Sequence, residues 1–167
     1  MLTELLPKKY SFNIGESVIS MRYTLAALLS LEQQGLSYEQ IFDEKLTARE
    51  ILQFFKAGLC EDFDDEYVEK IAYIVGFEKL WEHCVNAMIM AFPQPEKNVV
   101  PKPPNPNDED FSFVRLRALI CDVMGKSDDF FWQSTPAELI SRWLEYAYSM
   151  GYAEPPEKIL EFDVEGM

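Results

Sequence analysis

The stretch that most constrains the fold runs from Asp128 to Leu139, near the C-terminal end of the chain. Thr135 stands where a helix N-cap belongs, Pro136 suits the first helical position, and Glu138 is placed to complete a capping box. Together they predict a helix that begins at Pro136. Three consecutive aromatic side chains precede this start, and each removes a large apolar area from water only if something covers it.

These aromatic residues have two interpretations. They can be buried against a core beneath the start of the helix, which is the more common arrangement because large exposed apolar patches are rare. Alternatively, they bind a partner protein, since aromatic side chains are frequent interface anchors. The candidate partner-binding residues on this second interpretation are Phe130, Phe131, Trp132, Leu139 and Trp143.

The sequence predicts an all-α fold with one short N-terminal strand or hairpin. Alternation of polar and apolar residues from Lys8 to Ile14 is typical of a strand ending at Gly15. Apolar residues at helical spacing, capping residues and terminal glycines then predict roughly five helices with short connections. The expected helices cover 16–34, a short segment after the cap Ser37, 47–58, 67–75 and 78–92.

A change of composition divides the chain. Residues 93–110 hold several of the ten prolines and little that could build a core, so they are expected to form a proline-rich linker. The predicted organisation is a helical N-terminal domain over 1–92, this linker, a helical hairpin over 111–153 and an acidic tail over 154–167. A hairpin of this size is too small to be stable alone, so it should pack on the first unit or on another chain.

Charge and cysteine usage exclude several classes of protein. The net charge of −14 repels phosphate backbones and anionic lipids, so neither nucleic acid nor a membrane is an expected partner. Glu4 and Pro7 stand where a signal peptide would need an apolar block. The three cysteines are widely spaced, which fits reduced thiols in a cytoplasm better than a disulfide framework.

No catalytic, cofactor-binding or metal site is expected. The single histidine, His83, adjoins Cys84, and neighbouring positions on a helix point about 100° apart, so the two do not form a nucleophile pair. The acidic run at 61–66 suggests calcium, but the loop positions that need glycine and glutamate are occupied by Tyr67 and Tyr73. Phosphate-binding glycine loops are absent from the sequence.

Two segments carry a resemblance to a known family. The run from Met21 to Ser37, followed by Leu46-Thr47 and Ala57-Gly58-Leu59, resembles the N-terminal domain of tail assembly chaperones of long-tailed bacteriophages and gene transfer agents. The segment from Phe131 to Leu139 is similar to a short Phe-Trp, Thr-Pro-x-Glu-Leu motif in the companion protein or extension encoded beside that chaperone.

The resemblance implies a non-enzymatic assembly factor in the host cell cytoplasm. Such a factor binds the tape measure protein and recruits tail tube subunits during tail growth, and self-association into a homo-oligomer is compatible with this role. On this basis the aromatic hairpin would contact the tail partner. The competing interpretation is an acidic inhibitor or nucleic-acid mimic of a mobile element, which the net charge permits. A small hydrolase has no support in the spacing of the residues.

Overall fold

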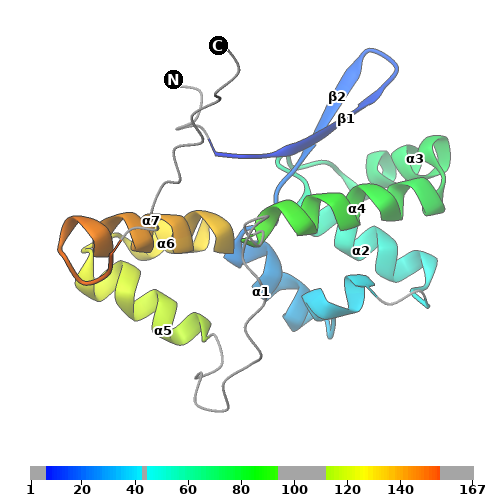
Figure 1. Ribbon diagram of the computed structural model, residues 1–167. Coiled ribbons are helices and arrows are strands. Elements are labelled where there is room, and N and C mark those ends of the chain that lie inside the picture. Colours follow the sequence, from blue (N-terminus) through cyan, green and yellow to red (C-terminus); the bar gives the residue numbers. More distant parts are fainter. Residues whose placement is uncertain (1–6, 43–44, 94–111, 155–167) are drawn as a thin grey trace, which may run out of the picture.

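The computed structural model describes residues 7–42, 45–93 and 112–154. The described chain is mainly helical and carries a short two-stranded antiparallel sheet near its N-terminal end (Figure 1). Of the expected linker and acidic tail, only Pro93 and Glu154 are described, and the rest of both segments lies outside the described residues. Within the described ranges, no helix has both the length and the apolar character that crossing a membrane requires.

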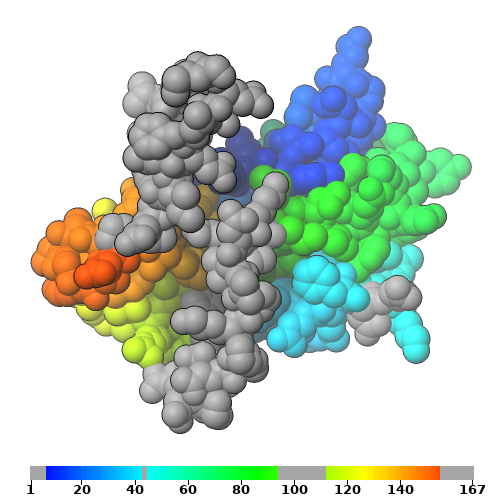
Figure 2. Space-filling model, in the orientation of Figure 1, coloured from blue at the N-terminus to red at the C-terminus, as the bar shows by residue number. Residues whose placement is uncertain are grey.

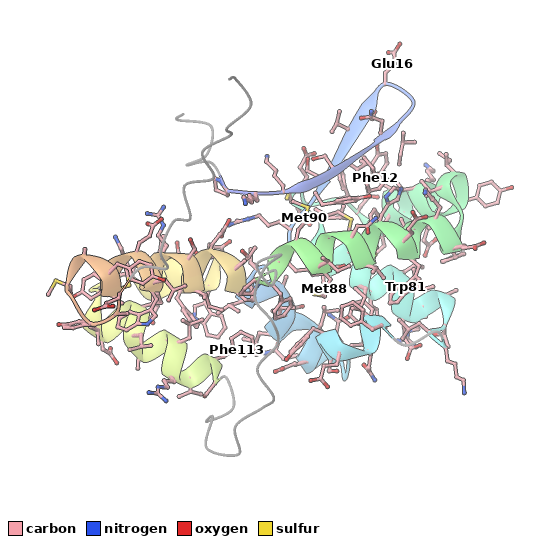
Figure 3. All side chains as sticks on the ribbon, viewed as in Figure 1. Phe12, Glu16, Trp81, Met88, Met90 and Phe113 are labelled. Atoms are coloured by element: carbon pink, nitrogen blue, oxygen red, sulfur yellow. The ribbon has the colours of Figure 1, made fainter. Side chains whose placement is uncertain are left out.

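The sheet is a β-hairpin that projects from the helical body (Figures 1 and 2). Strands β1 (Tyr10–Ile14) and β2 (Ser17–Met21) pair in antiparallel register through a turn at Gly15, whose φ of 58° suits a residue without a Cβ atom. The tip, marked by Glu16 in Figure 3, points away from the body.

The predicted helix over 16–34 is wrong in its first part. Residues 17–21 form β2, and α1 (Leu25–Gln33) begins only after Thr24, whose hydroxyl accepts a hydrogen bond from the Ala27 amide at 3.2 Å. The apolar residues before Thr24 have a spacing that also suits a strand, and pairing with β1 provides the backbone hydrogen bonds that a helix would have made. Tertiary pairing therefore overrode the helical pattern.

The other helices of the first unit begin and end close to the expected residues. The capping box at Thr47 is complete, and Gly76, with φ of 85°, ends α3 and begins α4. The segment after Ser37 is a 3₁₀ helix, and the Gln40 side chain accepts from the Ser37 amide at 2.9 Å. The elements are η2 (Tyr38–Phe42), α2 (Ala48–Gly58), α3 (Asp65–Val75) and α4 (Phe77–Ala91).

The C-terminal unit has more elements than the hairpin that the sequence predicts. The first helix of the expected hairpin is α5 (Phe113–Arg117) followed by a π-helical segment, η3 (Ala118–Val123). The aromatic stretch forms a short helix of its own, α6 (Asp128–Trp132), capped by the Ser127 hydroxyl. Helix α7 (Pro136–Ser149) begins at Pro136 with a complete capping box, as predicted.

The two units share one core. Helix α4 lies across α2, where Trp81 meets Phe54 edge-on with ring centroids 6.0 Å apart (Figure 3), and its C-terminal half contacts α7. The buried residues Leu116, Ile120 and Phe131 of the C-terminal unit belong to the same apolar cluster as those of the first unit. The C-terminal unit therefore packs on the first unit, which is one of the two expected outcomes.

Candidate partner-binding surfaces

The start of α7 meets the connection between β2 and α1 at a polar seam. The Arg22 guanidinium forms an ion pair with Glu138 and donates a second hydrogen bond to the Gln133 carbonyl at 2.9 Å. The same Glu138 oxygen accepts from the Thr135 amide at 2.9 Å. A backbone bond from the Leu25 amide to the Ser134 carbonyl, at 3.0 Å, continues the seam. One carboxylate thus caps α7 and also attaches it to the first unit.

The seam contains polar atoms that are buried without a partner. The side chains of Arg22 and Glu138 retain 19% and 25% of their exposure, yet the Arg22 Nε and Glu138 Oε1 atoms are buried and make no hydrogen bond. Leaving a buried donor or acceptor unpaired costs about 1–3 kcal/mol. The attachment of α7 is therefore specific in geometry but carries an energetic penalty.

A cavity of about 520 Å³ opens along this seam, within the size range of small-molecule and cofactor sites. Both units contribute to its wall, and its charged side chains are of both signs, so it suits a polypeptide segment of mixed polarity better than a simple anion. Its wall includes Lys8, Arg22, Met90, Phe130, Ala137 and Arg142.

The structure separates the five predicted partner-binding residues into two groups. Phe131 and Leu139 are 2% and 0% exposed, so they belong to the core. Phe130, Trp132 and Trp143 are partly buried against that core and keep some exposed surface. Of these, Phe130 lines the seam cavity, and the Lys126 Nζ atom lies 5.7 Å from the centre of its ring. Phe130 is consequently the predicted residue that is best placed to contact a partner.

His83 contacts the β-hairpin through a hydrogen bond and a stacked ring. The Tyr10 hydroxyl hydrogen-bonds to its Nδ1 atom at 2.7 Å, and the Phe12 ring stacks on the imidazole with centroids 3.8 Å apart. Partial burial, and then the nearby Lys79 ammonium, lower the pKa of His83. These contacts place the imidazole between the β-hairpin and α4, where it supports their packing.

The Cys84 side chain is buried in the core, apart from His83. It is fully buried, and burial raises the pKa of its thiol to about 12. Its neighbour is the Tyr23 side chain, whose own pKa is raised by burial and by Cys84. A thiol with such a pKa stays protonated at neutral pH and is a poor nucleophile. The structure therefore does not bring His83 and Cys84 together.

The acidic residues at the start of α3 cap the helix and form ion pairs with nearby lysines. Asp64 caps the helix by accepting from the Tyr67 amide at 2.7 Å, Asp65 pairs with Lys56, and Glu66 pairs with Lys70. Among the described residues, no group of three or more histidine, cysteine or acidic side chains is arranged to hold a metal ion.

Sequence reasoning missed several exposed apolar and aromatic side chains on α3 and at the first residue of α4. Tyr67, on the first turn of α3, is 40% exposed, and Tyr73, Ile74 and Phe77, near the α3–α4 corner, are 90%, 67% and 39% exposed. Tyr67 and Ile74 lie seven residues apart, on a side of the helix different from that of the buried residues Val68, Ile71 and Ala72. The seven-residue spacing of Tyr67 and Ile74 was the signal that could have revealed this exposed side of α3.

Comparison of the chain with protein-family models, curated proteins and solved structures found no match. The class of protein is therefore defined by the fold itself, a mainly α chain with an N-terminal β-hairpin.

Proposed function

We propose that this protein is a non-enzymatic tail assembly chaperone, which binds a tape measure protein and recruits tail tube subunits in the cytoplasm of a host cell. The observation that carries the proposal is the seam cavity, where the segment resembling the companion protein of these chaperones meets the segment resembling the chaperone itself. Glu138 and Arg22, which both line the cavity, come from these two regions.

The chemistry of the cavity supports a protein ligand. One aromatic ring, three basic side chains and three acidic side chains line one space, so a bound polypeptide segment can place an apolar side chain on Phe130 and polar groups on the charged rim. The positions of His83 and Cys84 favour a binding role over nucleophilic catalysis. Binding without covalent chemistry is the activity that this geometry serves best.

The net charge of −14 favours one alternative, an acidic inhibitor that occupies a basic partner. Several surface carboxylates are, however, neutralised by lysines: Glu66 pairs with Lys70 at 2.8 Å and Glu82 with Lys79 at 2.7 Å. A nucleic-acid mimic needs a continuous acidic face, so these ion pairs favour the function of a tail assembly chaperone over that of an acidic inhibitor.

The test is co-purification of the tagged full chain with the tape measure protein produced in the same cells. Phe130→Ser should reduce recovery of the tape measure protein by about tenfold, because an interface anchor contributes on the order of 1–2 kcal/mol. Val114→Ser is the control, since Val114 is 81% exposed on α5 and is not part of the cavity wall. Equal recovery with both variants would reject the seam cavity as the binding site.

A further inference from the structure

The β-hairpin has one covered edge and one open edge. Along β2, the Met21–Leu59 bridge and the bond from the Cys60 amide to the Ser20 carbonyl join the hairpin to the chain that follows α2. Along β1, no backbone hydrogen bond from another part of the described chain reaches the strand. The outer edge of β1 therefore keeps its backbone groups unpaired within the described structure.

The register of the hairpin identifies those groups. A two-residue turn joins the strands, so Ile14 and Ser17 form the first hydrogen-bonded pair, and every second pair along the strands repeats it. Ser11 and Asn13 fall between these pairs, and their N–H and C=O groups consequently point to the outer edge. Two donors and two acceptors thus lie at alternate residues of an extended backbone, which is the arrangement that another extended chain matches.

The open edge lacks the features that usually prevent strands from pairing with other chains. Natural edge strands are protected by charged residues, prolines or bulges. Strand β1 has the sequence Tyr-Ser-Phe-Asn-Ile, which contains neither a charge nor a proline, and no bulge interrupts its register with β2. The hairpin also projects from the helical body (Figures 1 and 2). The edge is therefore suited to pairing with a further strand.

Packing beneath the sheet disfavours a second copy of this chain as the partner. Helix α4 lies under β1, where the Phe12 ring stacks on His83. Two copies paired antiparallel through β1 would be related by a two-fold axis perpendicular to the sheet, and their α4 helices would lie under strands about 4.8 Å apart. Packed helices need about 8–10 Å between their axes, so the two helical bodies would collide.

The seam cavity lies at the base of the same hairpin. Lys8, two residues before β1, and Arg22, directly after β2, both line its wall. A segment that runs antiparallel to β1 passes from the tip of the hairpin towards Lys8, so its C-terminal residues arrive at the cavity. The open edge and the cavity therefore form one continuous site.

We propose that β1 accepts an extended segment of a partner protein as a third, antiparallel strand, and that the C-terminal residues of this segment occupy the seam cavity. Hydrogen bonds to the backbone of Ser11 and Asn13 hold the segment. Every second side chain lies on the side of the sheet that carries Tyr10, Phe12 and Ile14, so apolar residues are expected at those alternate positions. The inference rests on the proposed function in one respect, because it takes the seam cavity as a polypeptide-binding site.

The experiment selects ligands for the full chain from a display library of random peptides of about 12 residues, long enough to cover β1 and reach the cavity. Selected peptides are synthesised with an N-methyl group at each residue in turn, and their affinity is measured by fluorescence anisotropy. Methylation of alternate residues should weaken binding about tenfold, because each such change removes one hydrogen bond to β1. Methylation of the residues between them should have little effect.

Variants of the chain test the same edge. Ser11→Pro removes an outward N–H group and should weaken peptide binding about tenfold, whereas the hairpin should persist because this group makes no bond to β2. Ser11→Ala is the matched control, since it keeps the N–H group and should bind as the native chain does. The bound peptide should also slow hydrogen exchange of the Ser11 and Asn13 amides more than that of the Phe12 amide, which is already paired with β2.

Three results would overturn the inference: a library without binding peptides, an N-methylation effect that does not alternate along the peptide, and equal binding by Ser11→Pro and Ser11→Ala. Loss of peptide binding in Phe130→Ser with full binding in Ser11→Pro would keep the seam cavity as the binding site and reject the added strand. Because the peptides require no tape measure protein, an alternating N-methylation effect without co-purification of the tape measure protein would reject only the proposed function.

Discussion

Glu50 and Glu138 occupy the same position in two capping boxes but have different roles. Glu50 accepts from the Thr47 amide at 2.7 Å at an exposed helix start, and this hydrogen bond lowers the pKa of its carboxyl group. Glu138 makes the corresponding bond to Thr135 and also pairs with Arg22 across the seam. The local motif is the same, so the difference arises from what lies opposite each carboxylate.

We expect Glu138→Ala to lower the free energy of unfolding by about 2 kcal/mol. The change removes the cap of α7 and leaves the largely buried Arg22 guanidinium without its carboxylate. The free-energy cost is smaller than that of breaking a fully buried ion pair, because both side chains keep some contact with solvent. Glu50→Ala is the matched control, with an expected loss of about 0.5–1 kcal/mol. Urea denaturation of both variants measures the difference, and equal losses would show that the Arg22–Glu138 ion pair adds nothing to stability beyond the cap.

At the scale of elements, the end of α2 is fixed by the last residues of β2 and by Arg22, which follows them. The Arg22 amide donates to the Gly58 carbonyl, the Cys60 amide donates to the Ser20 carbonyl at 3.0 Å, and Met21 forms a bridge with Leu59. These bonds draw β2 tightly against the last turn of α2. The close approach requires a glycine, because a Cβ atom on Gly58 would lie 2.7 Å from the Tyr23 ring.

Gly58→Ala should therefore destabilise the protein by about 1–2 kcal/mol. Overpacking costs roughly 1–3 kcal/mol, which exceeds the gain of up to about 1 kcal/mol from the better helix propensity of alanine. Tyr23 cannot move easily, since it is fully buried and its hydroxyl donates to the Phe54 carbonyl at 2.7 Å. Thermal unfolding measures the change, with the exposed Arg49→Ala on the same helix as a control that should shift stability by less than about 0.5 kcal/mol. A stabilised Gly58→Ala variant would contradict the argument.

At the scale of the whole molecule, Phe131 joins the C-terminal unit to the shared core. It is 2% exposed, and its ring meets Trp132 edge-on at 5.3 Å. We expect Phe131→Ala to lower the free energy of unfolding by about 3–5 kcal/mol, as is usual when a buried aromatic side chain is removed.

Because the core is continuous, far-ultraviolet circular dichroism and tryptophan fluorescence should report one coincident transition in the native protein. Two separate transitions would mean that the units unfold independently, and Val114→Ala provides the near-neutral control.

The sequence by itself determined the starts of the helices capped by Thr47 and Thr135 and the end of α3 at Gly76. Thr47, Asp64 and Thr135 cap their helices through hydrogen bonds that reach only three residues along the chain, and Gly76 ends α3 through its own backbone freedom. Such interactions need no tertiary partner, so they can be predicted from the sequence alone. The location of the aromatic residues at a helix start was predictable for the same reason.

The tertiary structure decided the rest. Residues 17–21 became a strand because β1 and Leu59 supplied partners for their backbone, which no local pattern encodes. Packing on the first unit buried Phe131 and Leu139 but left Phe130 at the seam cavity. Burial and ion pairing depend on residues distant in the sequence, as in the Arg22–Glu138 pair, and only the folded chain brings these residues together.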